Sequence, residues 1–367
     1  MEKNSLFIIA ELGTSHGGDI VKARELIAAA AEAGADCIKC QIVFADEILH
    51  PKTGMVSLPG GEIPLFDAFK ALEKDENFYA DMKNEAEKRK IHFLATPFGP
   101  KSAALLKKLD PEAVKIASPE LNYLSLIKEL ASWGKPIYLS TGVSALGDIE
   151  EAIAVIQDAF PFHKKKTCLQ ELFLLHCVTA YPAPSEDYNL RLLPYLAGIF
   201  GVKVGLSDHT VDPVLAPVLG YAMGAVAVEK HFCLSRDDSG LDDPIALDPT
   251  GFKKMCAALH EVLSLGSQRI IDEMKHEFGP ELVEKTLGNG IKTLPPSEKA
   301  NYGRTNRSIH ALRDISEGDI IKQDMIAILR TEKILRPGLH PRWESAIIGR
   351  KARNAIPAGE GIRFEDI

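Results

Sequence analysis

Short apolar segments rich in β-branched residues alternate with amphipathic segments eight times along the first two thirds of the chain. The strand candidates are residues 6–11, 37–43, 92–97, 113–118, 136–141, 172–177, 202–207 and 225–232. The helix candidates are residues 19–33, 76–90, 101–109, 122–133, 147–160, 189–199, 211–223 and 249–265. Near-continuous apolar strands are typical of a parallel sheet covered by helices. Eight such units in about 260 residues predict an α/β fold, a (β/α)8 TIM barrel.

A doubly wound open sheet is the alternative arrangement of such units. It would carry a G-x-G-x-x-G phosphate-binding turn after the first strand. The sequence there reads AELGTSHGG (residues 10–18) and lacks that spacing. Several helix candidates also begin with a capping residue, such as Asp19, Ser102, Asp148 and Asp212. The pattern therefore favours the barrel.

The last hundred residues do not continue the alternation of strand and helix candidates. Residues 266–303 are polar, contain Pro295-Pro296, and predict one helix at about 267–286. The remaining segment has short alternating strands, many turns and a weak internal repeat between residues 314–326 and 355–367. We therefore expect a barrel domain at residues 1–266, a linker at 267–303 and a small β-rich capping domain at 304–367.

The net charge limits the kinds of binding partner, the N-terminal segment bears on the cellular compartment, and the cysteine spacing bears on a redox or zinc role. Lys and Arg total 43 against 51 Asp and Glu, a net charge of −8, so we expect no nucleic-acid partner and no membrane-surface partner. The N-terminal segment lacks the pattern of a signal peptide, which predicts a cytoplasmic protein. Cys37 and Cys40 form a C-x-x-C inside a strand candidate, where their thiols would point to opposite faces. That geometry argues against a redox or zinc pair.

Every strand candidate delivers polar side chains at its carboxyl end, where barrels of this class carry their active sites. Cations and hydroxyls, which suit a carboxylate plus a phosphate, are Lys39, Thr96, Lys115, Ser118, Ser140 and Ser207. Burying Lys39 and Lys115 is costly unless each meets an anion. The alternative is that the lysines pair with Glu11 or Glu229 and that no ligand is involved.

Two histidines, His209 and His231, end neighbouring strand candidates and can face a common centre. Two imidazoles with nearby carboxylates suit a divalent transition metal such as Mn, Zn or Fe, although a histidine is also often a packed core residue. The loop after the eighth strand is acidic and contains Asp242. The carboxylates of this loop could bind the hydroxyls of a neutral polyol, or the loop could simply be solvated.

Nine segments occur in the order and at the strand positions of a known family: IIAELGTSHGG, CIKCQIV, LATPFG, VKIASPELN, LSTGVS, LLHCVTAYPAP, VGLSDHT, VEKHF and RPGLHP. From about residue 6 to its end, the chain resembles the sialic acid synthase (N-acetylneuraminate synthase) family. Residues 304–367 resemble that family's SAF domain, an antifreeze-like, β-clip-like unit. The resemblance implies condensation of phosphoenolpyruvate with an N-acylated mannosamine-type sugar. The products would be a nonulosonic 3-deoxy-2-keto acid and phosphate.

The resemblance also implies roles for individual residues. His209 and His231 would bind a divalent metal, Mn preferred with Mg or Co possible, and Glu11 and Glu229 would be the acid/base carboxylates. Phosphoenolpyruvate would be held by Lys39, Thr96, Lys115, Ser118, Ser140, Thr179 and Ser207. The sugar would be held by Gln41, Glu120, Tyr181, Asp242 and Arg336. Arg336 would come from the SAF domain of the partner in a domain-swapped homodimer, with Arg330 the second candidate.

The sequence departs from the family pattern mainly on the sugar side, at residues 15–18 (S-H-G-G) and 240–243 (G-L-D-D). The acceptor therefore stays open among N-acetylmannosamine, its 6-phosphate and a 2,4-diacetamido-trideoxyhexose. Two other classes of function also stay open. One is a metal-dependent pyruvate aldolase on the same barrel, and the other is a non-catalytic carbohydrate- or ice-binding protein.

Overall fold

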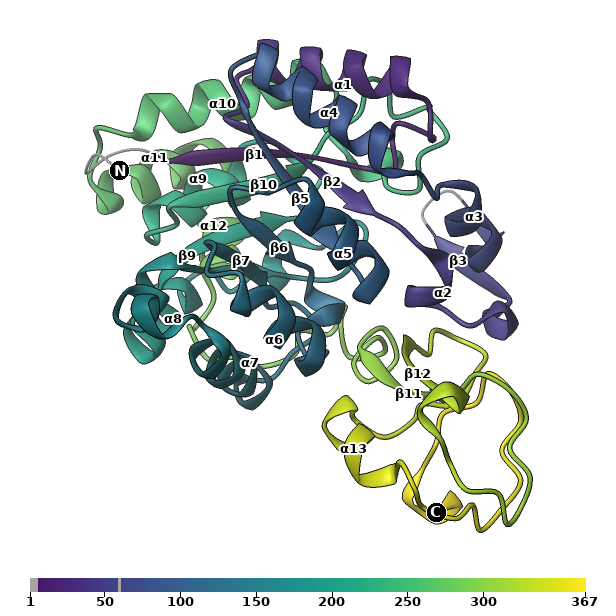
Figure 1. The fold of residues 1–367 in the computed structure, drawn as a ribbon. Helices are drawn as coiled ribbons and strands as arrows, with labels where there is room; N and C mark the ends of the chain where they lie inside the picture. The colour runs from purple at the N-terminus through teal and green to yellow at the C-terminus, as the bar shows by residue number, and fades with distance from the viewer. Residues whose placement is uncertain (1–5, 59–60) are drawn as a thin grey trace.

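The computed structural model describes residues 6–58 and 61–367, and its centre is a parallel barrel (Figure 1). The strands are β1 (Phe7–Gly13), β2 (Cys37–Ile42), β5 (His92–Pro97), β6 (Val114–Ile116), β7 (Ile137–Ser140), β8 (Leu172–Cys177), β9 (Lys203–Asp208) and β10 (Ala227–His231). They are hydrogen-bonded in the order β5-β2-β1-β10-β9-β8-β7-β6. The outer strands β5 and β6 lie against each other, so the ring is nearly closed. The predicted eight-stranded barrel is confirmed.

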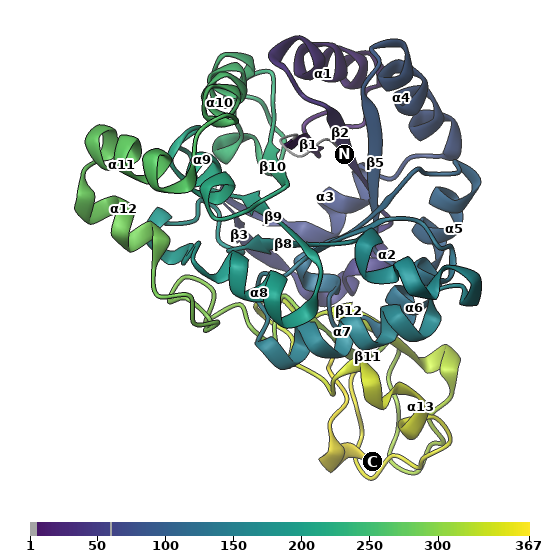
Figure 2. The same ribbon diagram turned by 90° about the vertical axis from the view of Figure 1, so that its left-hand side faces the viewer.

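Helices surround the strands on the outside, as Figure 2 shows. They are α1 (Ile20–Ala33), α4 (Glu76–Lys88), α5 (Pro100–Lys108), α6 (Leu124–Ser132), α7 (Leu146–Ala159), α8 (Leu192–Phe200), α9 (Leu215–Ala222) and α10 (Pro249–Val262). Asp19 caps α1 by accepting the Val21 N–H at 2.7 Å, and Asp212 accepts the N–H groups of Val214 and Leu215 before α9. Within the described ranges, no helix is both long and apolar enough to cross a membrane.

The inside of the barrel is apolar at one end and polar at the other. Ile9, Cys37, Leu94, Tyr138 and Phe173 form an apolar layer, which we call the floor, in which the Tyr138 and Phe173 rings stack at 4.5 Å. Strand side chains alternate between faces, so the inward positions two residues further along each strand form the next layer. Most of those positions are polar, which places the polar side chains together at the carboxyl ends of the strands.

The cysteines behave as expected. All six thiols are free and buried. Cys37 lies in the floor, whereas Cys40 packs in the layer between the strands and the helices. Because the two thiols lie on opposite faces of β2, the C-x-x-C does not form a pair.

The segment between β2 and α4 folds into elements that the sequence pattern did not predict. These are α2 (Ala45–Ile48), β3 (Met55–Leu58), β4 (Gly61–Pro64) and α3 (Leu65–Ala71), with β3 and β4 forming a hairpin. The elements are short, and Gly and Pro interrupt the periodicity that reveals longer helices and strands. Val56 and Leu65 from this insertion pack with Phe98 beside the barrel mouth. The insertion therefore builds one wall of the mouth.

The linker differs from the single predicted helix. It contains α11 (Ser267–Phe278) and α12 (Pro280–Leu287), separated by Gly279, which has a φ of +87°. A glycine with positive φ followed by a proline ends one helix and starts another. Residues 288–306 then follow without helix or strand, and we call this segment the strap.

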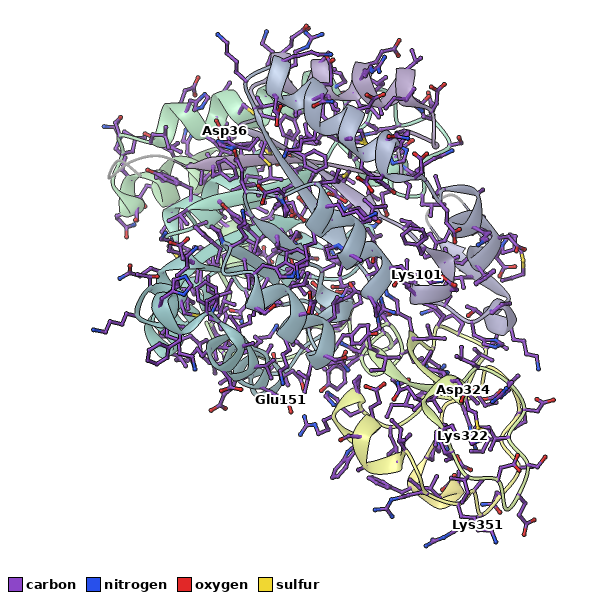
Figure 3. The ribbon with its side chains drawn as sticks, viewed as in Figure 1. Asp36, Lys101, Glu151, Lys322, Asp324 and Lys351 are labelled. Atoms are coloured by element: carbon purple, nitrogen blue, oxygen red, sulfur yellow. The ribbon has the colours of Figure 1, made fainter. Side chains whose placement is uncertain are left out.

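The C-terminal unit begins at β11 (Arg307–Ala311), which pairs antiparallel with β12 (Ile326–Arg330), and it also contains α13 (Glu344–Ile347). The weak repeat seen in the sequence folds together, because Ile315 and Ile356 form a β-bridge inside a small apolar core. The unit projects from the barrel below α6 and α7 (Figures 1 and 2). Glu151 of α7, labelled in Figure 3 next to this unit, binds Arg342 at 2.6 Å.

Candidate active site

Two lysines and two carboxylates form a buried charged layer directly above the floor. Lys39 Nζ lies 2.8 Å from Glu11 Oε2 and 3.4 Å from Glu229 Oε1, and Lys115 Nζ lies 3.8 Å from Glu229 Oε2. Each of the four side chains is at most 5% exposed. The ion pairs considered as the alternative from sequence are therefore present, and their four charges sum to zero. An anion that enters this layer can take over lysine contacts that the carboxylates now hold.

The two lysines differ in how firmly they keep their protons. Burial lowers the pKa of Lys115 to about 8, because the attraction of Glu229 only partly offsets the loss of solvation. Burial also acts on Lys39, but Glu11 and Glu229 together raise its pKa above the usual value. Lys39 is therefore a permanent cation, whereas Lys115 can exchange a proton near neutral pH.

The two carboxyl groups of this layer also differ in pKa. Burial raises the pKa of Glu11, and Lys39 only partly counteracts it. Burial also acts on Glu229, but Lys115 and Lys39 lower its pKa overall. Two neighbouring carboxyl groups with pKa values pushed apart are suited to different tasks, one exchanging a proton and one remaining charged.

The predicted hydroxyls surround this layer. Lys115 donates to Ser140 Oγ at 2.7 Å, and Ser207 Oγ donates to Glu229 Oε1 at 3.1 Å. Thr96 is fully buried, and its hydroxyl has no hydrogen-bond partner within the part of the chain that the structure describes. An orphaned hydroxyl in a charged layer has its hydrogen-bonding capacity available for a ligand.

Ser118 and Thr179 come together at Gly142, at the end of β7. A Cβ atom at Gly142 would lie 2.9 Å from Ser118 Oγ and 2.2 Å from Thr179 Oγ1. Glycine at this position therefore lets the two hydroxyls meet. All seven residues assigned to phosphoenolpyruvate from the sequence lie on barrel strands or within two residues of a strand's carboxyl end, although their roles stay predictions.

The two histidines also meet at the mouth, and their ring centroids are 5.4 Å apart. His209 Nδ1 lies 2.8 Å from the Val178 carbonyl. In the neutral ring, a proton on Nδ1 leaves the Nε2 lone pair free, which is the tautomer that a metal-binding histidine needs. Burial lowers the pKa of His209, but Cys177 and the Val178 carbonyl raise it to about 9 overall, so a bound ion would take the place of the proton on Nε2. Asp242 Oδ2 lies 3.8 Å from His231 Nδ1. Among residues 6–58 and 61–367, no group of three or more His, Cys, Asp or Glu side chains has metal-ligand spacing. The described residues thus bring two imidazoles together, with the Asp242 carboxylate beside one of them.

A cavity of about 450 Å³ opens above the charged layer. Its lining includes Lys39, Gln41, Thr96, Tyr181 and Asp242. Gln41 donates to Glu11 Oε1 at 2.8 Å, and the Tyr181 ring stacks on His209 with centroids 4.4 Å apart. Three of the residues assigned to the sugar therefore lie around one cavity next to the lysines and histidines. A second cavity, of about 470 Å³, lies below the floor and contains none of the predicted site residues.

Glu120 and the C-terminal arginines are arranged differently from the expectation. Glu120 is fully buried, and its Oε1 binds Arg330 at 2.7 Å and Arg307 at 2.9 Å. Arg330 lines the cavity, whereas Arg336 binds Asp366 and the Gly361 carbonyl inside the C-terminal unit. Within one chain, Arg330 rather than Arg336 thus lines the cavity. The reach of Arg336 into a partner's barrel concerns a dimer and stays a prediction.

Sequence reasoning missed two buried residues at the mouth, Arg307 and Glu298. Arg307, the first residue of β11, is almost fully buried and binds Glu120 at the barrel mouth. Glu298 belongs to the strap, is fully buried, and accepts the backbone N–H groups of Val143 and Thr179. A charged residue in a polar segment carries no sequence signal that it will be buried, because its burial depends on contacts with residues more than a hundred positions away.

The comparison with known proteins agrees with this architecture. The NeuB family model matches residues 26–269, and the SAF domain model matches residues 306–367. The chain belongs to the NeuB family. It is 33% identical to the spore coat polysaccharide biosynthesis protein SpsE of Bacillus subtilis, over 99% of this chain and 93% of that one. The crystal structure of SpsE matches with a TM-score of 0.80 and covers 100% of this chain and 96% of its own.

Two further NeuB-family relatives are named for their products. The N,N'-diacetyllegionaminic acid synthase of Campylobacter jejuni is 33% identical, with 88% of this chain and 90% of that protein aligned. The pseudaminic acid synthase of Helicobacter pylori is 32% identical, with 98% of this chain and 97% of that protein aligned. The family and SAF-domain resemblance inferred from the nine segments is confirmed.

Proposed function

We propose that this chain is a nonulosonic acid synthase. It condenses phosphoenolpyruvate with an N-acylated mannosamine-type sugar and releases phosphate by cleaving the C–O bond. The observation that carries the proposal is the neutral layer of Lys39, Lys115, Glu11 and Glu229 beside the His209–His231 pair. Relatives of similar length are named as synthases of legionaminic and pseudaminic acids, which supports the same class of product.

The charged layer suits a small, highly charged anion. Phosphoenolpyruvate presents a carboxylate and a phosphate, and Lys39 and Lys115 can each face one of them. Thr96, Ser140 and Ser207 add hydroxyl donors around the same space. Fixing both anionic ends orients C3 of the enol toward the cavity, which is a positioning contribution.

A divalent metal, Mn preferred with Mg or Co as alternatives, fits the His209–His231 pair. The fit rests on the His209 tautomer favoured by the Val178 carbonyl and on the open positions around two imidazoles. When bound, the ion supplies Lewis acidity toward the aldehyde oxygen of the open-chain sugar. His209 and His231 would hold it, with Asp242 close to His231.

The chain's own carboxylates serve the remaining steps. C3 of phosphoenolpyruvate bonds to the aldehyde carbon, the C=O π bond breaks and its oxygen takes up a proton, and the positive charge that develops at C2 faces Glu11 and Glu229. Water adds to C2 and gives up a proton, which Glu11 is suited to take because its pKa is raised. The resulting hemiketal phosphate loses phosphate, which keeps the bridging oxygen, and the keto group forms at C2.

The direct test of the proposal mixes the purified protein with phosphoenolpyruvate, Mn²⁺ and a panel of 2-acetamido and 2,4-diacetamido sugars. We expect release of inorganic phosphate and a product mass that equals sugar plus pyruvate. With ¹⁸O in the bridging position, the label should leave with phosphate; label retained in the keto acid contradicts the order of steps. An aldolase would instead use pyruvate without phosphate release, and a carbohydrate-binding protein would turn over no member of the panel.

The metal proposal predicts loss of activity on chelation. His209→Ala removes one of two imidazole ligands, so we expect kcat to fall by about 100-fold or more. Wild-type activity should vanish in EDTA and return with Mn²⁺, and bound manganese should fall in the variant by elemental analysis. His92→Ala, which removes an exposed imidazole at the opposite end of the barrel, is the matched control. Full activity of His209→Ala in chelator would remove the metal role.

The pKa of Lys115 predicts how phosphoenolpyruvate use depends on pH. The charged ammonium binds the anion, and it loses its proton as pH rises through its pKa of about 8. We therefore expect kcat/KM for phosphoenolpyruvate to decline above that pH, approaching about tenfold per pH unit. Initial rates at subsaturating phosphoenolpyruvate measure the profile. The alkaline decline should be missing in Lys115→Met, and its persistence there would assign the titration to another group.

A further inference from the structure

The strap is fastened across the loops that follow β7 and β8. Lys292 donates to the Thr141 carbonyl at 3.0 Å, and Asn306 donates through its side chain to the Val143 carbonyl at 2.9 Å. The strap ends where β11 begins, so it also carries the C-terminal unit. Any change that lifts the strap from these loops therefore changes how that unit is held over the mouth.

Glu298 projects from the strap into the barrel mouth. It is fully buried, and its Oε1 accepts the Val143 N–H at 2.9 Å and the Thr179 N–H. Two convergent backbone donors at strand ends form a small anion-binding cradle. Glu298 Oε2 is buried and has no hydrogen-bond partner among the residues that the structure describes. The carboxylate thus fills the cradle but leaves half of its own hydrogen-bonding capacity unused.

The cradle overlaps the predicted phosphoenolpyruvate site. The Cβ position that Gly142 leaves open lies 3.1 Å from Glu298 Oε1, 2.9 Å from Ser118 Oγ and 2.2 Å from Thr179 Oγ1. One carboxylate oxygen therefore stands among the hydroxyls that the family resemblance assigns to phosphoenolpyruvate. A phosphate bound by Ser118 and Thr179 would meet this carboxylate directly.

The Glu298 carboxylate and a bound phosphate exclude each other from this cradle because both are negatively charged. Both a carboxylate and a phosphate are anionic acceptors, and they compete for the same N–H donors. Lys39 and Lys115 are already paired with Glu11 and Glu229, and the cation whose charge interacts with Glu298 is Lys292 of the strap, one positive charge for two anions. Adding a phosphate beside a fixed Glu298 would bring two like charges together in a buried space, which is strongly unfavourable.

We propose that Glu298 is an internal occupant of the phosphate subsite and that substrate phosphate displaces it, which loosens the strap around residue 298. This inference rests on the proposed function, because that function supplies the phosphate. Phosphate binding and strap attachment then oppose each other through one pair of N–H groups. By linkage, a phosphate that weakens the strap is itself bound more weakly while the strap is in place.

Binding of inorganic phosphate tests the competition. If the cradle is free about a tenth of the time, emptying it should strengthen phosphate binding by about tenfold. We expect this gain in calorimetry with Glu298→Ala, and a smaller gain with Glu298→Gln, which keeps an acceptor but loses the charge. Glu281→Gln, which removes the same charge from an exposed position on α12, should leave the affinity unchanged. Glu298→Gln also covers the case in which Glu298→Ala fails to fold.

Proteolysis tests the loosening of the strap. Lys299 is exposed and follows Glu298 directly. We expect inorganic phosphate to accelerate tryptic cleavage after Lys299 in the wild type by about threefold or more, since the population with a loosened strap rises with ligand. In Glu298→Gln the cleavage should already be faster without phosphate, and phosphate should change it less. Pyruvate, which carries a carboxylate but no phosphate, is the control ligand. We expect the wild type and the Glu298 variants to bind pyruvate equally, and we expect pyruvate not to change their rate of tryptic cleavage.

Three results would overturn the inference. The first is an equal affinity for phosphate in the wild type and both Glu298 variants. The second is slower tryptic cleavage after Lys299 when phosphate is bound. The third is a Glu298 variant that binds pyruvate, and not phosphate, more tightly than the wild type. The proposed function is judged separately by phosphate release from phosphoenolpyruvate in the wild type. An active wild type with equal affinities rejects only the role of Glu298, whereas an inactive wild type rejects the synthase.

Discussion

Lys115→Met is expected to reduce kcat/KM for phosphoenolpyruvate by about 100-fold or more, with most of the effect in KM. The substitution keeps the length of the side chain but removes its charge. Hydrogen bonds to charged groups contribute about 1.5–3 kcal/mol each, and about 1.4 kcal/mol corresponds to tenfold. Lys115 is fully buried beside Ser140 and Glu229, so water cannot replace the missing cation.

Steady-state kinetics with phosphoenolpyruvate varied at saturating sugar measure this effect. Lys203→Met is the matched control, since Lys203 packs on the Phe173 ring at the opposite end of the barrel. It removes the same charge without touching the mouth, and KM should stay near the wild-type value. A phosphoenolpyruvate KM in Lys115→Met that stays within about threefold of wild type would show that Lys115 does not bind the anion.

The second large effect concerns stability. Arg307→Met is expected to lower the free energy of unfolding by about 3–5 kcal/mol, because it removes one of the two cations on the buried Glu120 and leaves buried backbone carbonyls without a donor. Arg307 binds Glu120 at 2.9 Å, and it also donates to the backbone carbonyls of Phe98 and Glu47. These contacts join β11 to the loops at the barrel mouth, so the loss should fall on the attachment of the C-terminal unit.

Urea denaturation followed by fluorescence and by circular dichroism measures the change. Arg342→Met removes the surface pair with Glu151, and we expect a loss of about 1 kcal/mol or less. Adding Glu120→Gln to Arg307→Met should lower the stability further, because Arg330 then loses its carboxylate partner as well. A loss below about 1 kcal/mol in Arg307→Met would mean that the C-terminal unit is held by other contacts.

The barrel could be predicted because its signal is local and repeated. Each strand carries a continuous apolar run, and alternation within a strand fixes which side chains face inward. Ile9 faces inward, so Glu11, two residues further along the same strand, lies in the layer above it. In the same way, Lys39 lies in the layer above Cys37. The ion pairs between them could be foreseen as an alternative because both charge types occupy one layer.

The parts that could not be predicted depend on contacts between distant segments. Glu298 and Arg307 lie in polar or short segments, and their burial follows from how the strap and β11 approach the mouth. Arg336 and Arg330 are close in sequence and chemically identical, so only the packing of β12 against the barrel decides which one reaches the mouth of the same chain. The hairpin of β3 and β4 is likewise defined by its packing next to Phe98 rather than by periodicity.

The apolar floor has a kinetic consequence. It separates the charged layer from the opposite end of the barrel, so the route to Lys39 and Lys115 through the described residues runs by way of the mouth. The lysines are almost fully buried, whereas Tyr181 is 38% exposed and lies nearer the opening. A sugar seated on Tyr181 would stand in the path of phosphoenolpyruvate. Substrates should therefore enter in a fixed order, the small acid first and the sugar second, and a sugar that arrives early should act as a dead-end inhibitor.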